Sequence, residues 1–302
     1  MRVAIIGGGV SGLACARALA SENEVVVFDK GRGFGGRLST RRVQTSSGND
    51  LAFNHGAPKI ETGVAGAFHE MITGAVQCDA ARWLGDSTAA GTPTMNALVA
   101  WMGRGLDPRF GVRVARLERD AQGERLWDDA GTDLGTFDRV VVTAPAPQAS
   151  ELVKDRAPEL IASLERIAYA PAWVSLVTLP PSSAPADGPF ECDGDVLSTN
   201  TGSGRAWVLR ATAGWSAAHL EDAHERVADA LGRAAERAAP LFATAQDARA
   251  HRWRYARVVS CISEPCVASD DGGVWVCGDG FGGSDARLAW ESGTYTGRAI
   301  RA

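Results

Sequence analysis

Near its N-terminus the chain reads Val3-Ala4-Ile5-Ile6-Gly7-Gly8-Gly9-Val10-Ser11-Gly12, an apolar run followed by a glycine-rich turn. An Ala- and Leu-rich segment, residues 13–20, follows at once, and a second apolar run, residues 25–28, ends at Asp29. The pattern predicts a buried strand, a tight turn, a helix and a second buried strand. This order is typical of a dinucleotide-binding βαβ unit in a Rossmann-type α/β fold.

The spacing of the glycines gives each of them a separate role in such a unit. Gly7 allows the tight turn, Gly9 lets the backbone approach a pyrophosphate, and Gly12 lets the helix pack closely on the sheet. The pyrophosphate would bind at the start of the helix, which adds Ser11 to the candidates. Asp29 lies about 20 residues further on, where a carboxylate binds the ribose hydroxyls and would repel a 2′-phosphate. The nucleotide is therefore predicted to be FAD or NAD rather than NADP.

A second glycine-rich segment, residues 31–36, matches the same motif, but polar residues 37–42 follow it instead of an apolar helix. It is therefore not predicted to be a second Rossmann turn. Arg37 could reach back to the pyrophosphate with a planar, permanently charged guanidinium. The segment 29–40 resembles the one by which FAD-dependent amine oxidases and their relatives continue the dinucleotide fold, and NAD dehydrogenases lack it. The resemblance implies FAD and adds Lys30 and Gly36 as cofactor-binding residues.

Composition and charge narrow the class of protein. The 302 residues are 45% hydrophobic and 22% charged, with a net charge of −5, which is typical of a globular chain without a basic surface for nucleic acid or anionic membranes. No apolar run approaches the about 20 residues that span a bilayer, and the glycines interrupt the apolar N-terminus before it could serve as a signal peptide. We therefore expect a cytoplasmic protein that has neither nucleic acid nor a membrane as a partner.

The six cysteines are scattered and include no CxxC pair, and no histidine cluster accompanies them. No metal site is therefore predicted. The chain also lacks the cysteine setting through which some amine oxidases tether their flavin. The FAD is accordingly expected to be bound noncovalently.

The remaining pattern predicts two interleaved domains. Residues 1–57, 94–150 and 268–302 are expected to form the Rossmann-type FAD-binding domain. Residues 58–93 and 151–267 are expected to form a discontinuous, mostly antiparallel β-sheet substrate domain. By resemblance, this α/β arrangement is of the amine oxidase/p-hydroxybenzoate hydroxylase type.

Individual elements follow from the periodicity of the apolar residues. Ser216 is expected to be the N-cap of a long amphipathic helix. Polar residues 44–50 and Pro/Ser-rich residues 180–189 are expected to be connectors. The expected strands are residues 51–57, which run into a glycine turn, 112–117, 125–128, 137–142, 172–179, 206–213, 249–258 and the first part of 273–284, which continues into a glycine turn. The expected helices are a segment that follows Thr92-Pro93-Thr94-Met95 and stops at Gly103, and residues 151–167, about 217–238 and 286–300.

Further cofactor contacts are implied by the resemblance to amine-oxidase-like flavoproteins. A strand ending in His-Gly passes beside the flavin, a small-residue turn re-enters the nucleotide domain, and a late Gly-Asp pair binds the ribityl hydroxyls. An ordinary turn histidine is the alternative for His55. The residues that match these positions are His55, Gly56 and Ala57 beside the flavin, Val114 with its backbone at the adenine, Thr143 in the turn, and Gly278 and Asp279 at the ribityl chain.

Three stretches make the resemblance more specific. They are His251-Arg252-Trp253-Arg254-Tyr255-Ala256, Gly214-Trp215-Ser216, and Gly278-Asp279-Gly280-Phe281 with residues 289–293. Together with Thr92-Pro93-Thr94-Met95, they are similar to the renalase family of flavin amine oxidases. The resemblance implies an oxidase of dihydronicotinamide (NAD(P)H) isomers. In that chemistry a 1,2- or 1,6-dihydro ring gives a hydride to flavin N5, and O2 then reoxidises the flavin with release of hydrogen peroxide.

Strand alternation gives the His-Arg-Trp-Arg-Tyr stretch two different faces. It places His251, Trp253 and Tyr255 on one face and the two arginines between them on the other. We expect the His251 face to meet the flavin cavity, with His251 orienting the substrate carboxamide and Trp253 flanking it. Trp290 is expected to form a second wall. Core packing is the alternative for Trp253 and Tyr255.

Two other functions remain open. A flavin amine oxidase acting on a small amine would keep every FAD motif, although such sites usually place an aromatic pair around the amine, and no such pair is identified. A noncatalytic flavin-binding redox protein would keep the same motifs. The predicted partners are a small-molecule substrate, either a dihydronicotinamide dinucleotide or an amine, and O2.

Overall fold

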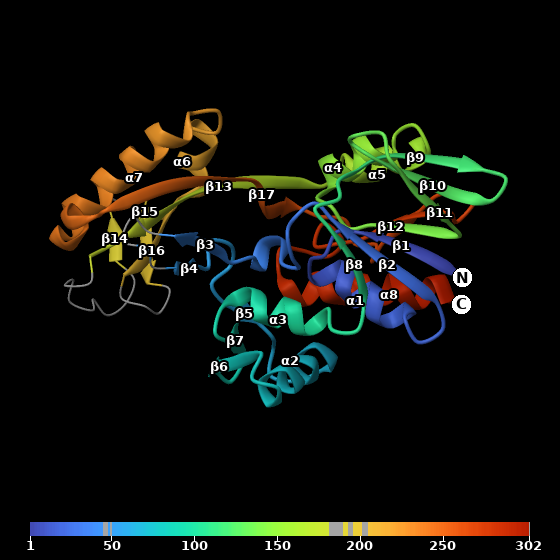
Figure 1. Ribbon diagram of the computed structural model, residues 1–302, viewed down its shortest axis with the longest axis horizontal. Coiled ribbons are helices and arrows are strands. Elements are labelled where there is room, and N and C mark those ends of the chain that lie inside the picture. Colours follow the sequence, from blue (N-terminus) through green and yellow to red (C-terminus); the bar gives the residue numbers. More distant parts are fainter. Residues whose placement is uncertain (45–47, 49, 181–189, 193–195, 201–204, 302) are drawn as a thin grey trace. The chain divides into compact units, whose positions relative to one another are not determined.

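The computed structural model describes residues 1–44, 48, 50–180, 190–192, 196–200 and 205–301 (Figure 1). The chain divides into two compact units. Unit 1 comprises Met1–Arg37, Lys59–Ala168 and Val258–Ala302, and unit 2 comprises Leu38–Pro58 and Tyr169–Arg257. Within the described residues, no helix combines the length and the apolar character needed to cross a membrane.

Unit 1 is built on a six-stranded sheet with the order β18-β19-β12-β1-β2-β8. Its strands are β1 (Arg2–Ile6), β2 (Glu24–Asp29), β8 (Asp107–Phe110), β12 (Arg139–Val142), β18 (Val267–Ala268) and β19 (Val274–Val276). Five of them run parallel, and β18 joins the edge antiparallel to β19. The central strands are buried, which explains their continuous apolar sequences. The predicted Rossmann-type α/β fold is confirmed.

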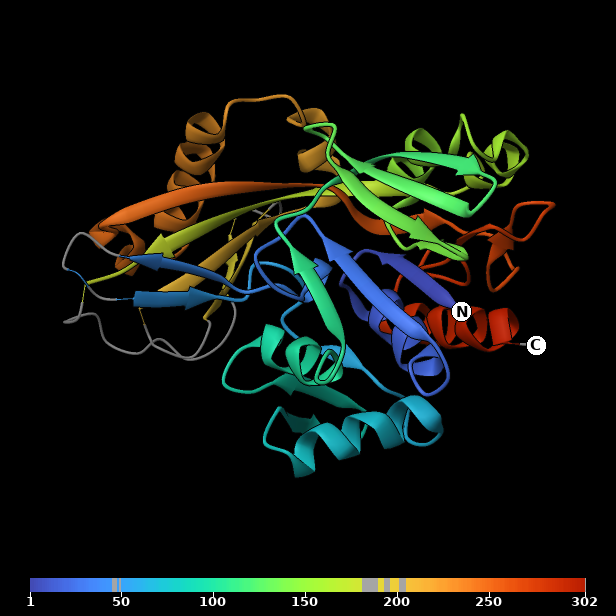
Figure 2. The same cartoon turned by 45° about the vertical axis from the view of Figure 1, so that its right-hand side comes forward.

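Helices α1 (Val10–Leu19) and α8 (Ala286–Arg301) lie side by side against this sheet (Figure 2). Gly293 and Gly297 of α8 permit the approach, because a Cβ atom on them would lie 2.0 Å from the Ser11 carbonyl oxygen and 2.8 Å from that of Cys15. Behind the two helices, Ile5 and Val141 belong to the buried core. The first and last segments of the chain therefore stabilise each other.

The predicted meander forms a separate three-stranded sheet of β9 (Val114–Asp120), β10 (Gly123–Asp128) and β11 (Asp133–Phe137), paired antiparallel. The strand predicted over residues 137–142 is divided between two sheets, because β11 ends at Phe137 and β12 begins at Arg139. The residue between them, Asp138, bonds to the start of β1: its N–H donates to the Arg2 carbonyl at 2.8 Å, and its carboxylate accepts the Arg2 N–H at 2.6 Å.

The single helix predicted over residues 151–167 is wrong. The segment forms α4 (Ala146–Val153), a 3₁₀ helix η2 (Pro158–Leu160) and α5 (Ile161–Leu164). Pro158 has no N–H to donate within a helix, and it disfavours helical backbone at the residue before it. Ala157 accordingly adopts φ −143° and ψ 65°, outside the helical region.

Residues 59–93, which were expected in the substrate domain, fold within unit 1. They form an antiparallel sheet and a helix that contacts α8, while the next helix contacts both this sheet and α1. The bounds of the predicted domains therefore differ from those of the units, and the domain assignment stays a prediction. The elements are β5 (Ile60–Glu61), α2 (Ala67–Gln77), β6 (Ala81–Gly85), β7 (Thr88–Gly91) and α3 (Met95–Met102), the last of which lies where the sequence predicts a helix.

Unit 2 is built on a five-stranded sheet with the order β14-β15-β16-β13-β17. The pairs β14–β15, β15–β16 and β16–β13 are antiparallel, as predicted for this part of the chain. Residues 45–47 and 49 of the predicted loop, and 181–189 of the predicted connector, lie outside the described residues. The strands are β13 (Ala168–Thr178), β14 (Phe190–Cys192), β15 (Val196–Asn200), β16 (Ala206–Ala211) and β17 (Asp247–Ser260).

Both faces of this sheet are covered by other parts of unit 2 (Figure 1). Trp173 and Trp207 pack with helix α7 (His224–Ala238) on one face. Val174 and Val208, their neighbours in sequence, pack on the other face with the antiparallel hairpin of β3 (Arg41–Gln44) and β4 (Asp50–Phe53). The strand predicted to start at residue 51 and run into a glycine turn ends at Phe53 in the structure. The alternation of side chains along each strand gives unit 2 two apolar layers.

The helix predicted over residues 217–238 is divided, and Ser216 is not its N-cap. Helix α6 (Ala213–Ala218) has Thr212 as its N-cap, whose hydroxyl accepts the Trp215 N–H at 3.3 Å, and α7 begins separately at His224. Ser216 is fully buried, and its hydroxyl accepts the backbone N–H of Trp173 at 3.0 Å. The prediction that Ser216 caps the helix is wrong, because its hydroxyl binds a distant strand instead of its own helix.

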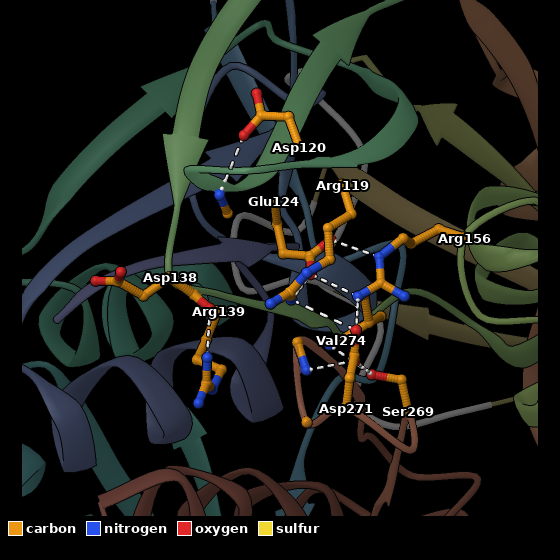
Figure 3. Close-up of polar contacts among 12 residues, drawn as sticks. Arg119, Asp120, Glu124, Asp138, Arg139, Arg156, Ser269, Asp271 and Val274 are labelled. Carbon is orange, nitrogen blue, oxygen red and sulfur yellow. Dashed lines mark hydrogen bonds and ion pairs between the residues drawn. The ribbon is translucent and has the colours of Figure 1, made fainter.

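An ion-pair network around a buried glutamate joins three parts of unit 1 (Figure 3). The fully buried Glu124 on β10 accepts two bonds from Arg156, at 2.6 and 2.7 Å, and one from Arg119 at 2.7 Å. Arg156 also pairs with Asp271 in the turn before β19. The Glu124 carboxylate raises the pKa of Arg156. Desolvation alone would raise the pKa of Asp271, but bonds from Ser269, Gly273 and Arg156 hold it well below its usual range.

Removing the central arginine of this network should destabilise the fold. The substitution Arg156→Met would leave the Glu124 carboxylate buried with one guanidinium instead of two, so we expect the free energy of unfolding to fall by about 3 kcal/mol. The matched control is Lys154→Met, since the exposed Lys154–Glu151 pair should contribute less than about 1 kcal/mol. Urea unfolding followed by circular dichroism measures both. Equal losses in the two variants would contradict this role.

Candidate functional site

The glycine turn after β1 is held so tightly that two of its positions exclude any side chain. Gly7 adopts φ +118°, and a Cβ there would lie 2.4 Å from the Thr143 hydroxyl oxygen. A Cβ at Gly12 would lie 2.0 Å from the Gly7 carbonyl oxygen. The Thr143 hydroxyl, in turn, donates toward the Ile6 and Gly7 carbonyls at 3.1 and 3.2 Å. The predicted turn residues 7, 12 and 143 are thus in direct contact.

A Cβ atom added at Gly9 would have open space around it, whereas one at Gly7 or Gly12 would not. Among the described atoms outside its chain neighbours, only Gly36 Cα, at 3.9 Å, lies within 4 Å of a Cβ built at Gly9. Gly9 is also the N-cap of α1 and offers no side chain to the N–H groups of the first turn. A space left open in front of unpaired helix N–H groups is the arrangement that binds a pyrophosphate.

Asp29 is fixed beside this turn by backbone donors. Its two carboxylate oxygens accept the N–H groups of Gly8 and Gly31, both at 2.6 Å. A carboxylate has about four acceptor positions, so capacity remains for ribose hydroxyls. Lys30, the next residue, is exposed. The open space at Gly9, the free helix donors and the oriented carboxylate together fit the phosphates and ribose of a dinucleotide.

The second glycine segment lies along the first. The Gly35 N–H donates to the Gly8 carbonyl at 3.0 Å, and Gly36, with φ +54°, faces Gly9. Directly after it, Arg37 forms an ion pair with Asp279, a residue 242 positions away in the sequence. Asp279 is buried, with only 6% of its surface exposed. Two residues predicted to bind the pyrophosphate and the ribityl chain are therefore brought together.

Three further residues predicted to bind the cofactor also lie in unit 1, namely Ser11, Gly278 and Val114. The Ser11 hydroxyl lies 3.4 Å from Cys277 Sγ, and the Gly278 N–H donates to the Ser292 hydroxyl at 2.9 Å. Val114 is a buried residue at the start of β9. Ser292 was missed because its role is to hold a backbone group of another segment, which no local pattern reveals.

Unit 2 contains a cluster of His55, His251 and Trp253. The ring centroids are 4.8 Å apart for the two histidines, 4.6 Å for His251 and Trp253, and 5.1 Å for His55 and Trp253. Trp253 Nε1 donates to the His55 carbonyl at 3.0 Å, and Arg210 Nη1 approaches the same oxygen at 3.4 Å. His55 is 6% exposed, and its Nδ1 is buried without a hydrogen-bond partner among the described residues. Gly56 and Ala57 directly follow His55 in the sequence.

Both faces predicted for the His-Arg-Trp-Arg-Tyr stretch occur in the structure. On the face opposite His251, Arg252 and Arg254 both bind Glu221, at 2.9 and 2.6 Å. Trp253 also packs against a buried core cluster, so its ring contributes to the core of unit 2 as well as contacting the two histidines. Tyr255 contacts Tyr169 at a centroid distance of 5.7 Å, away from the two histidines.

Burial lowers the pKa of His55 and of His251 to about 4. Positive charge reinforces the shift: Arg41 lowers the pKa of both histidines, and Arg210 lowers that of His55. Both rings are therefore neutral at physiological pH. They can orient a polar substrate by hydrogen bonds without carrying charge.

Trp290, the third predicted catalytic residue, lies in unit 1. Its ring centroid is 5.7 Å from that of Phe68 on α2. His251 and Trp253 lie together in unit 2, as do His55, Gly56 and Ala57. Among the described residues, no group of three or more His, Cys, Asp or Glu side chains could hold a metal ion.

Comparisons with known proteins agree with this arrangement. Residues 5–73 match the model of an NAD(P)-binding Rossmann-like domain, and residues 66–259 match that of flavin containing amine oxidoreductases. The fold is also similar to the crystal structure of a candidate protoporphyrinogen oxidase from Exiguobacterium sp. 255-15, with a TM-score of 0.66 and 13% sequence identity. That match covers 99% of this chain and 98% of the other.

The space at Gly9 gives a direct test of cofactor binding. Gly9→Ala places a methyl group where the pyrophosphate should bind, and the backbone there, at φ −90° and ψ −175°, accepts any residue. We expect FAD affinity to fall at least about tenfold, or 1.4 kcal/mol, while the apoprotein loses no more than about 1 kcal/mol of unfolding free energy. Fluorescence titration of the apoprotein with FAD and urea unfolding measure the two effects.

Gly33→Ala is the matched control for that variant. A Cβ at Gly33 meets no described atom within 4 Å outside its chain neighbours, and the residue is exposed. It should bind FAD as the unaltered protein does. Equal FAD affinity in the Gly9 and Gly33 variants would show that the pyrophosphate does not lie at Gly9.

The histidine pair gives a prediction of pH dependence. Both pKa values lie near 4 in the folded protein, below the about 6.5 of an unfolded histidine, so the unfolded state binds more protons between these values. Stability should therefore fall as the pH decreases from about 6.5 to 4. Histidine NMR titration, with His55→Asn and His251→Asn to identify the signals, should show two rings titrating near pH 4. A midpoint near the ordinary value for either ring would contradict this environment.

Proposed function

The chain belongs to the flavin-containing amine oxidoreductase family and is an FAD-dependent oxidoreductase, and from this premise we propose that it oxidises isomers of dihydronicotinamide dinucleotides. The proposal covers the 1,2- and 1,6-dihydro forms of NAD(P), with O2 as the final electron acceptor. It extends the sequence resemblance to the renalase family, which lies within the flavin amine oxidases.

Bound FAD would supply a hydride acceptor and a route for two electrons to O2, with release of hydrogen peroxide. The substrate ring loses one hydride and becomes an aromatic pyridinium cation, so no proton has to leave it. One solvent proton and one O2 per turnover complete the formation of hydrogen peroxide. The protein groups around the substrate therefore need to position the ring, and they need no strong base.

The observation that carries the proposal is the contact of the His251 and Trp253 rings, 4.6 Å apart between centroids, with the buried His55 beside them. His251 can exchange hydrogen bonds with a carboxamide, and Trp253 offers a flat aromatic surface beside it. Two neutral histidines near an aromatic ring suit a planar, neutral substrate ring. No carboxylate is among the groups that shift the pKa of either histidine.

Oxidation of a small amine is the second candidate, and the family match over residues 66–259 favours it. An amine in its ammonium form would find Arg41 and Arg210 near the histidines, and among the described residues no carboxylate shifts the pKa of either ring. It would have to bind as the neutral free base. This requirement makes the amine the less favoured substrate.

Anaerobic mixing of the FAD-loaded protein with possible substrates distinguishes the two candidates. We expect 1,2- and 1,6-dihydro-NAD(P) to bleach the flavin absorbance, and ordinary 1,4-NADH and benzylamine to leave it unchanged. Hydrogen peroxide should form when air is admitted. Bleaching by benzylamine alone would move the assignment to an amine oxidase.

Variants on the two faces of β17 test the role of His251. We expect His251→Ala to slow the bleaching by at least about tenfold, because the carboxamide loses its orienting partner. The matched control is Arg254→Gln on the opposite face, where the exposed pair with Glu221 should leave the rate nearly unchanged. Equal rates in both variants would contradict a role of His251 in binding the substrate.

A further inference from the structure

We propose that Arg41 and Arg210 form a binding site in unit 2 for an anionic oxygen group, a carboxylate or a phosphate, carried by a ligand whose flat ring lies against His251 and Trp253. The inference rests on the proposed function in naming the substrate as the source of this anion. It adds a charge requirement that neither the family nor the fold supplies.

Arg210 is a half-buried cation in an otherwise apolar strand. It lies on β16 after the buried Val208 and Leu209. Its Nη2 donates to the Asn54 carbonyl at 2.9 Å, while its Nε is buried with no partner among the described residues. It forms no ion pair within the described part of the chain. Desolvation lowers the pKa of Arg210 to about 10, so the guanidinium stays charged at neutral pH.

Arg41 reaches the same cluster from the hairpin. It stands opposite Phe53 in the β3–β4 register and shares a face of β3 with Val43, which packs in the core against the sheet. The Arg41 side chain is exposed at the end of that layer, and it makes no ion pair among the residues described. Its charge nevertheless lowers the pKa of both His55 and His251, which places it within electrostatic reach of the two rings.

The charges on the two sides of β17 differ in a way that points to a ligand. On the far side, Glu221 neutralises Arg252 and Arg254. On the histidine side, Arg41 and Arg210 have no acidic partner among the residues that the structure describes, and the two histidines remain neutral. A buried uncompensated charge is costly to stability unless a counter-ion accompanies it. An anionic ligand would supply that counter-ion.

The chemistry of the pair selects the ligand. Guanidinium groups bind carboxylates and phosphates through paired N–H donors, while ammonium groups would be repelled. The aromatic rings beside them favour a flat ring system. A dihydronicotinamide nucleotide has such a ring and carries phosphates. Any other planar anion of similar size would also supply the negative charge that the two arginines require.

Three pyridines of nearly the same shape and different charge test the site in the FAD-loaded protein. They are nicotinate, an anion, nicotinamide, which is neutral, and 3-(aminomethyl)pyridine, a cation. We expect nicotinate to bind at least about tenfold more tightly than nicotinamide, equivalent to 1.4 kcal/mol, and the cation to bind most weakly. Calorimetry gives the affinities, and competition by inorganic phosphate shows whether a phosphate takes the same place.

Arg41→Gln should remove most of the preference for the anion and leave nicotinamide binding unchanged. Arg42→Gln is the matched control, because Arg42 is equally exposed and lies on the other face of the same strand. A loss for nicotinate identifies a carboxylate site, and a loss for phosphate alone identifies a phosphate site. If neither anion binds better than nicotinamide, or if both variants behave alike, the proposal is overturned.

These outcomes are independent of turnover. An anion preference without oxidation of any dihydronicotinamide isomer would keep the site and reject the proposed function. Oxidation of the isomers without an anion preference would keep the proposed function and reject the anion site.

Discussion

The close approach of backbone around the first glycine turn is the constraint on which unit 1 depends. Gly12 lies over the Gly7 carbonyl, Gly7 lies against Thr143, and Gly293 of α8 lies against Ser11, each too close for a side chain. These contacts bring the ends of β1 and β12 and the last helix of the chain to one place. A dinucleotide site at the carboxyl ends of parallel strands follows from this packing.

Unit 2 contributes chemistry of another kind. Its sheet separates two apolar layers, and the long strand β17 carries different charge arrangements on its two faces. Glu221 neutralises the arginines on one face, while His251 on the other face lies beside His55 and near Arg41 and Arg210, which form no ion pair among the described residues. The first face stabilises the fold. The second is suited to a planar, neutral or anionic substrate, and this is the basis of both proposals made for the site.

The sequence predicted what depends on neighbouring residues and missed what depends on distant ones. The strand, turn, helix and acid up to Asp29 follow one another directly, so their spacing alone identifies the βαβ unit. The break at Pro158 has a local cause that the apolar periodicity concealed. The pairing of Arg37 with Asp279 joins segments 242 residues apart, and no spacing rule predicts it. Arg210 is predicted only as a strand residue, and the fold shows that it is half-buried, with no acid paired to it in the described part of the chain. Its position in an otherwise apolar strand was the available signal.

We expect the glycine turn, the start of α1 and Asp29 to bind the ADP half of FAD. Titrating the apoprotein with FAD and with FMN tests this most directly, because FMN carries the same flavin and lacks the adenosine phosphate that these residues would bind. We expect tight binding of FAD and at least about a hundredfold weaker binding of FMN, or about 2.8 kcal/mol. Equal affinity for the two cofactors would contradict it, since the flavin alone would then account for the binding.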